Sequence, residues 1–192
     1  MSAIETIYDY FEDHGKAAVA VKESKPILLG MFGISVGAVS IFVAHGMADR
    51  LGLLTFSVSS LALTLLWELT AGFLTAAVLH LILDCEGAQG SAASLFVLLG
   101  MANLVWALAV PFVLICRMLL PASSWASTLV FLFVGLMSFG LKARSIRDNY
   151  QITSTRAWIS LGLPYLALVV GAILALSLAT YILILKALQW AQ

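Results

Sequence analysis

A single acidic side chain, Glu68, lies at the centre of a long apolar run that reaches from about Leu53 to Leu83 and has no other formally charged residue. A helix of this length, at about 1.5 Å per residue, is longer than the hydrocarbon layer of a bilayer, which is about 30 Å thick. Glu68 would lie near mid-membrane, where a charge costs at least about 2.5 kcal/mol on insertion scales. The carboxyl must therefore be protonated, paired with another group or turned toward a polar interior.

Composition indicates a lipid environment for the whole chain. Hydrophobic residues make up 62% of the 192 residues and charged residues 10%, whereas soluble domains average about 45–50% and about 25%. A water-soluble fold of this length could not bury so much apolar surface. We therefore predict an all-α polytopic membrane protein whose surroundings are the lipid bilayer. Because ten basic residues balance ten acidic ones, no nucleic-acid partner is expected.

Five apolar tracts predict five transmembrane helices, which together form a membrane domain over residues 26–192. Proline removes a backbone hydrogen bond, so Pro111 should kink the third helix and Pro164 should break the first turn of the fifth. Polar and basic residues between the fourth and fifth tracts predict a cytoplasmic loop over 142–156. The predicted spans are 26–48, 53–83, 95–119, 125–141 and 158–186.

Residues 1–25 precede the first span and have the pattern of a cytoplasmic amphipathic helix. Ser2 and Glu5 have the spacing of a capping box. Membrane-surface helices are rich in Lys and Arg on their polar face, but this helix is acidic. We therefore expect it to pack against the cytoplasmic side of the protein or a partner, with a plain interfacial helix as the alternative. Its apolar stripe consists of Ile4, Ile7, Tyr8 and Phe11, at helical spacing.

Five spans place the two ends of the chain on opposite sides of the membrane. The side that carries the N-terminal segment and the 142–156 loop has more Lys and Arg than the other side. The positive-inside rule then predicts a cytoplasmic N-terminus and a C-terminus outside. No cleavable signal peptide is expected, because the first residues are polar and rather acidic.

Glu68 is the leading candidate for polar chemistry inside the membrane. Thr64, Gly72 and Thr75 lie within helical reach of its face, at i−4, i+4 and i+7. Asn103 is the deep polar residue of the third span. These side chains can form a hydrogen-bonded cluster that joins helices, or they can line a route for protons or cations. Because no opposite charge lies near Glu68 in the sequence, desolvation favours a protonated carboxyl.

Two further patterns indicate contact surfaces. Gly33 and Gly37 form a G-x-x-x-G pair on the first span, which lets a second helix approach closely. That helix belongs to this chain or, alternatively, to a second copy in a homo-oligomer. Basic residues of the 142–156 loop set the topology and contact lipid headgroups or, alternatively, dock an acidic partner. These basic residues are Lys142, Arg144, Arg147 and Arg156.

No catalytic, metal or cofactor site is predicted. His45 and His80 would lie roughly a membrane apart, so they cannot share a haem or a metal ion. Cys85 and Cys116 are too few for a structural zinc site. The chain has no P-loop, no dinucleotide-binding turn, no H-E-x-x-H and no G-x-S-x-G. We therefore expect a protein that is not an enzyme.

Two segments resemble bacterial Yip1-domain proteins. LTAAVLHLILDCEGAQGSAASLFVLLGMANLVWALAVPFVLI (74–115) is similar to the family region in which a long helix, a glycine-rich loop and a proline-containing helix follow one another. GLMSFGLKARSIRDNYQITSTRAWISLGLPYLALVV (135–170) is similar to the next region, in which a polar stretch precedes a helix opened by a proline. The matching positions are Pro111, Tyr150, Thr153, Arg156, Ala157 and Pro164.

The resemblance implies a non-enzymatic protein with five helices and a cytoplasmic N-terminus. Eukaryotic members resemble trafficking proteins that contact Rab GTPases, but their D-L-Y-G-P motif is absent here, which implies a bacterial type in the cytoplasmic (inner) membrane. We expect a scaffold, assembly or accessory subunit whose partners are other membrane proteins. The alternatives are a small transporter or ion-conducting subunit that uses Glu68, and a lipid-binding or lipid-flipping module.

Overall fold

The computed structural model describes residues 2–48, 56–120 and 124–190, and within these ranges the chain is helical without a β-strand. The predicted all-α class is therefore confirmed. In chain order the helices are α1 (Ala3–Glu12), α2 (His14–Ser24), α3 (Ile27–Met47), α4 (Val58–Cys85), α5 (Ala92–Ala102), the 3-10 helix η1 (Asn103–Leu108), α6 (Ala109–Leu119), α7 (Ser124–Tyr150) and α8 (Ser154–Trp190).

Five helical stretches are long and apolar enough to cross a membrane, as in a multi-pass integral membrane protein. They correspond in order to the five predicted spans, and the third combines α5, η1 and α6. The predicted start of the second span at residue 53 lies outside the described residues. The five stretches are Ile27–Met47, Val58–Cys85, Ala92–Leu119, Trp125–Tyr150 and Ser154–Leu183.

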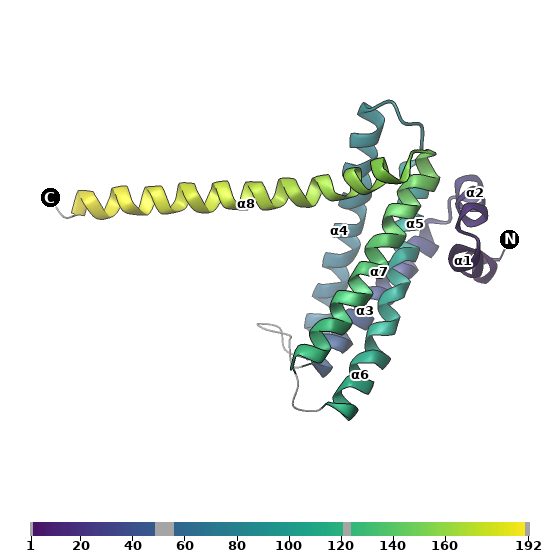
Figure 1. Cartoon of the computed structure of the whole chain (residues 1–192), viewed down its shortest axis with the longest axis horizontal. Helices are drawn as coiled ribbons and strands as arrows, with labels where there is room; N and C mark the ends of the chain where they lie inside the picture. The colour runs from purple at the N-terminus through teal and green to yellow at the C-terminus, as the bar shows by residue number, and fades with distance from the viewer. Residues whose placement is uncertain (1, 49–55, 121–123, 191–192) are drawn as a thin grey trace.

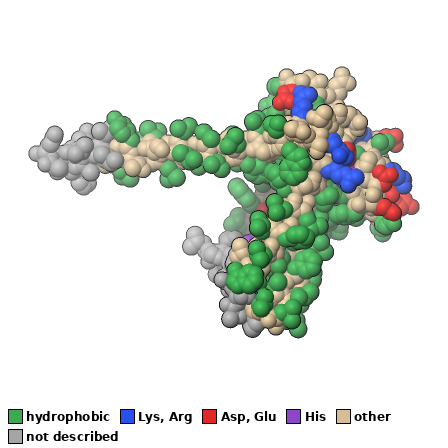
Figure 2. Space-filling view, viewed as in Figure 1, with side chains coloured by type: hydrophobic (Ala, Val, Ile, Leu, Met, Phe, Trp, Pro, Cys, Tyr) green, Lys and Arg blue, Asp and Glu red, His purple; other side chains and the backbone are tan. Residues whose placement is uncertain are grey.

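The helices α3 to α7 run along one another in an elongated bundle, and α1 and α2 lie beside one end of it (Figure 1). Because α2 packs against α5 and α7, the N-terminal segment is fixed to this end. Figure 2 shows charged side chains gathered at the same end, whereas the visible long side of the bundle is mainly hydrophobic. This distribution is expected when the long sides face lipid and the ends meet water.

Glycine residues bring α3 and the third span into backbone contact. A Cβ atom built on Gly33 would collide with the carbonyl group of Gly100. A Cβ atom built on Gly37 would lie 2.7 Å from the carbonyl oxygen of Asn103. Larger residues at these positions would push the two helices apart. The G-x-x-x-G pair therefore packs within the chain, which is the first of its two predicted uses.

The N-terminal segment forms two helices rather than the single helix predicted. The capping box is present: the Ser2 hydroxyl accepts from the Glu5 N–H at 3.2 Å, and the Ser2 N–H donates to the Glu5 carboxylate at 2.6 Å. The helix is interrupted at Asp13, whose carboxylate caps α2 by accepting from the Lys16 N–H at 3.3 Å. Aspartate favours such a break, because its side chain competes for backbone hydrogen bonds.

Three of the four residues of the predicted apolar stripe of α1 are exposed. Ile4 and Tyr8 are 80% and 64% exposed, and Phe11 is exposed as well. Ile7 instead packs against the buried cluster that contains Tyr10 and Leu98. The stripe therefore docks α1 on the bundle only through Ile7, and contact of its exposed residues with a partner or with lipid stays a prediction.

The third span loses its regular α-helical structure before Pro111, over Asn103–Leu108, rather than at Pro111 itself. The α-helix stops at Asn103, the chain continues as the 3-10 helix η1, and α-helical structure resumes at Ala109. Pro111 lies in the first turn of α6, where its missing N–H is tolerated but its ring disfavours a regular α-helix just before it. The span therefore contains an irregular segment that begins at its deep polar residue.

The predicted 142–156 loop is wrong, because most of this segment is helical. The helix α7 continues to Tyr150, because no glycine or proline interrupts residues 141–150 and several of them favour helix. Gln151 then adopts a left-handed conformation with φ of 54°, and α8 starts at Ser154. This extension moves Lys142 from a loop into a membrane-spanning helix.

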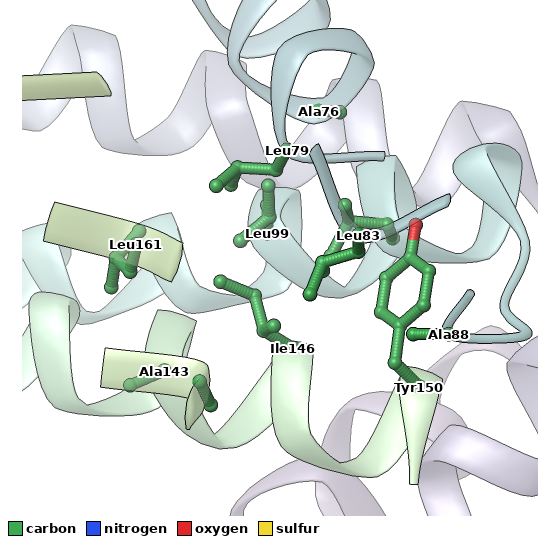
Figure 3. Packing of buried hydrophobic residues seen from close by; sticks show 11 residues of the cluster. Ala76, Leu79, Leu83, Ala88, Leu99, Ala143, Ile146, Tyr150 and Leu161 are labelled. Carbon is green, nitrogen blue, oxygen red and sulfur yellow. The ribbon is translucent and has the colours of Figure 1, made fainter. Parts of the chain in front are cut away.

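The helix α8 contacts the bundle only along its first turns. Leu161 is buried against Ile146 of α7 and Leu79 of α4 in an apolar cluster (Figure 3). All residues from Tyr165 to Leu183 are exposed. Figure 1 shows α8 extending away from the bundle, across its long direction. The predicted break at Pro164 is wrong, because Pro164 lies within the continuous helix α8. Most of α8 thus has no neighbour within the described chain.

We predict that Gly33→Ala destabilises the protein, because the added methyl group meets the backbone of Gly100. Overpacking of this kind costs about 1–3 kcal/mol. The matched control is Gly140→Ala in α7, where an added Cβ atom meets nothing within 4 Å. Thermal unfolding in detergent should show a lower midpoint for Gly33→Ala alone. Equal midpoints for the two variants would contradict the close contact of α3 and α5.

Candidate functional site

A small polar cavity, partly open to the surface of the bundle, lies where α3, α4, α5, η1, α7 and the start of α8 meet. Its volume is about 110 Å³, which would hold about four water molecules at about 30 Å³ each. Apolar side chains form one part of its wall, and charged and polar side chains form the other. The lining residues are Ile34, Glu68, Ala71, Gly72, Thr75, Leu99, Asn103, Lys142 and Tyr165.

Glu68 of α4 and Lys142 of α7 bring opposite charges to this cavity. The carboxylate of Glu68 acts electrostatically on the ammonium group of Lys142. The two groups make no direct ion pair in the described parts of the chain. The sequence near Glu68 supplies no countercharge, as stated above, but the fold does. The countercharge comes from a distant segment, and it reaches the cavity because α7 continues beyond residue 141.

The predicted polar cluster around Glu68 is brought together in part. Thr75 and Asn103 line the cavity with Glu68, as predicted. Thr64 does not line it, and its hydroxyl donates to the Ser60 carbonyl oxygen of its own helix at 2.9 Å. Tyr165, which the sequence did not single out, closes part of the wall from α8 and lies within the electrostatic reach of Glu68.

The arginines of the 142–156 segment bind acidic side chains of the same chain. Arg147 Nε lies 2.7 Å from Asp148 Oδ1, and Arg144 Nε lies 4.0 Å from Asp148 Oδ2. Arg156 makes an ion pair of 2.8 Å with Glu86, which joins the start of α8 to the end of α4. These charges stabilise the cytoplasmic end that the sequence predicts. Their use by an acidic partner stays a prediction.

A second polar cluster fixes α1 and α2 to the end of α7. His14 is fully buried; its Nδ1 lies 2.8 Å from Asp148 Oδ2 and its Nε2 lies 3.3 Å from Ser145 Oγ. The Tyr10 hydroxyl makes a hydrogen bond of 2.9 Å with the same Ser145 oxygen. Lys22 Nζ donates to the Asp148 carbonyl oxygen at 3.3 Å. We call these five residues the hairpin clamp.

Burial lowers the pKa of His14, because desolvation disfavours the charged imidazolium. Asp148 opposes this effect, whereas Arg144 and Arg147 add to it. His14 is therefore neutral at neutral pH, and its Nδ1–H is the group that can donate to Asp148. Burial also raises the pKa of the Tyr10 phenol, which keeps the hydroxyl protonated within the clamp.

The other two histidines have separate partners. His80 Nδ1 lies 2.7 Å from the Tyr150 hydroxyl, and His45 Nδ1 lies 2.9 Å from the Ile41 carbonyl oxygen. Over the ranges that the structure describes, no group of three or more His, Cys, Asp or Glu side chains could hold a metal ion.

No protein-family model matches the chain, and no curated protein or solved structure matches it either. The resemblance to Yip1-domain proteins therefore stays a prediction.

We predict that acid weakens the contact of the N-terminal helices with α7. Once released, His14 would titrate near its ordinary pKa of about 6.5, whereas the docked form binds the proton less readily. The free energy of docking therefore falls as the pH drops below about 6.5. Ala17 is fully buried in the docked form. In a chain whose native cysteines are replaced, thiol labelling of an Ala17→Cys variant should become faster in acid relative to the control described next, since the intrinsic labelling rate falls as the thiolate is protonated.

The control for this measurement is the same chain with His14→Asn. Asparagine can donate to Asp148, but it does not titrate. It also corrects for the pH dependence of the labelling reaction itself. An identical acid response in both chains would show that His14 does not control docking.

Proposed function

We propose that this protein is a non-enzymatic accessory or assembly subunit of a membrane complex, with other membrane proteins as partners. The observation that carries the proposal is the exposure of α8. Its Ser154–Leu183 portion is long and apolar enough to cross a membrane, yet all of its residues from Tyr165 onward are exposed. Helices in membrane proteins associate through close packing of their surfaces. Most of α8 is free to pack in this way on a neighbouring protein.

The sequence of α8 supports close helix packing. A stripe of small residues recurs at four-residue spacing, which lets membrane helices approach each other closely. A Cβ atom built on Gly171 would meet nothing within 4 Å, in contrast to Gly33, whose missing side chain admits a neighbouring helix. The close approach that the stripe allows is thus unused within the described chain. The stripe consists of Ala167, Gly171, Ala175 and Ala179.

The N-terminal helices supply a second contact surface under this proposal. Ile4, Tyr8 and Phe11 are exposed and, together with Ile7 and Glu12, line an open groove on α1. We place this end in the cytoplasm of a bacterial cell, with the C-terminus outside the inner membrane. The support is the positive-inside rule and the Yip1-like resemblance.

Bulky residues on the stripe should remove the partner. In mild detergent we expect the chain to co-purify with a membrane protein in fixed stoichiometry. Gly171→Leu together with Ala175→Leu should abolish this association, because leucine side chains hold a second helix away. Ile173→Phe is the matched control, since Ile173 lies on the opposite face of α8 and is also exposed. A chain that purifies alone would contradict the subunit role.

Transport is a second candidate function, because Glu68 lies in a polar cavity within the bundle. Lys142 lines the same cavity and would repel a cation that approached Glu68. A proton or a solute without net charge is therefore a better candidate than a free cation. The lipid-binding or lipid-flipping alternative stays open, because a larger apolar groove of about 420 Å³ lies between α3, α4 and α5, lined by side chains that include Met31, Phe73 and Phe96.

Glu68→Gln separates the two candidate functions, because glutamine has nearly the shape of glutamate but no charge. For an accessory subunit we expect normal expression, intact association and unchanged proton or solute flux in vesicles. Flux that is present in the native chain and lost in an intact Glu68→Gln complex would favour transport over the subunit role.

A further inference from the structure

We propose that the Glu68–Lys142 cavity binds a small zwitterion, such as a short α-amino acid. The ammonium group of the ligand would face Glu68, and its carboxylate would face Lys142. This binding site goes beyond the accessory role, and it requires neither a partner on α8 nor transport.

The charges of the cavity select a ligand that carries both signs. Glu68 and Lys142 line the same space without a direct ion pair, and neither has another ion-pair partner among the described residues. Both side chains are half-buried, and a charge that is withdrawn from water is costly unless a hydrogen-bonded counter-ion satisfies it. A simple cation would pair with Glu68 but would be repelled by Lys142. A simple anion would pair with Lys142 but would be repelled by Glu68. A zwitterion satisfies both residues and adds no net charge to the membrane interior.

The size of the cavity limits the ligand. A volume of about 110 Å³ equals the space of about four water molecules at about 30 Å³ each. Because bonded atoms lie closer together than separate water molecules, this space admits a compact molecule of about five or six non-hydrogen atoms. Glycine and alanine have this size. Gly72 helps to keep the space open, because a Cβ atom there would lie 2.8 Å from Ile34 Cδ1. Amino acids with long side chains should therefore be excluded.

The uncharged wall of the cavity matches the rest of such a ligand. Thr75, Asn103 and Tyr165 place a hydroxyl, an amide and a phenol on the lining, and these groups can share the remaining hydrogen bonds of an ammonium or a carboxylate. Apolar contact for a hydrogen or methyl side chain comes from Ile34, Ala71 and Leu99. The cavity thus offers two charges, three polar groups and a small apolar surface.

Binding can be tested by calorimetric titration of the full-length protein in lipid nanodiscs. Glycine, alanine, β-alanine, methylammonium and acetate are the probes. We expect saturable binding of glycine or alanine, weaker binding of β-alanine because its charges are farther apart, and no binding of methylammonium or acetate alone. The absence of zwitterion binding, or equal binding of one of the singly charged probes, would overturn the proposal.

Variants place the ligand in this cavity. Glu68→Gln and Lys142→Met should each weaken binding by about 30-fold or more, as expected when one side of a buried charge pair is removed. Thr64→Val is the matched control, because Thr64 lies one turn from Glu68 but does not line the cavity; its affinity should be unchanged. Undiminished binding in a folded Glu68→Gln variant would overturn the assignment.

A third variant keeps the test decisive if loss of a charge prevents folding. Ala71→Leu keeps both charges and fills the cavity with a larger apolar side chain. We expect it to unfold at a midpoint close to that of the native chain and to lose binding. Retained binding in this variant would overturn the proposed site. The result of this binding test does not depend on the subunit role, because the subunit role is tested separately by co-purification of a partner.

Discussion

The interior of the bundle has to accommodate two opposite charges that do not touch. An ion in a low-dielectric interior costs several kcal/mol even after relaxation of its surroundings. Glu68 and Lys142 can remain there because they line one cavity and act on each other across it. The two charges fix which faces of α4 and α7 point toward each other. Apolar packing alone does not fix them, because an apolar helix can face lipid in many orientations. The arrangement also involves α8, whose Tyr165 closes part of the cavity.

The backbone of the third span makes this arrangement possible. Gly33 and Gly100 let α3 lie directly against α5, so the bundle is tightly packed where these two helices meet. The α-helix then stops at Asn103, and the 3-10 helix η1 takes its place as far as Leu108. A 3-10 segment within a longer helix presents its side chains differently from a regular α-helix. The polar cavity thus lies at the junction of the closely packed α5 and the irregular η1, where Asn103 lines it.

Local sequence signals predicted the helices and part of the cavity. Long apolar tracts predict membrane helices without knowledge of their neighbours, and Glu68, Thr75 and Asn103 stand out against an apolar background. Lys142 was assigned to a loop because charged residues follow an apolar tract there. The lack of glycine and proline up to Tyr150 was the signal that could have placed it in a helix. Contacts such as His14 with Asp148, which are 134 residues apart, depend on tertiary packing and leave no local pattern.

The most direct test is a double-mutant cycle on the pair that faces the cavity. The free energy of unfolding in detergent would be measured for the native chain, Glu68→Gln, Lys142→Met and the double variant. Because the two charges act on each other across the cavity, we expect a coupling free energy of about 1 kcal/mol, within the range of residues that interact. The double variant should be less destabilised than the sum of the two single effects. Strictly additive effects would show that Glu68 and Lys142 do not stabilise each other.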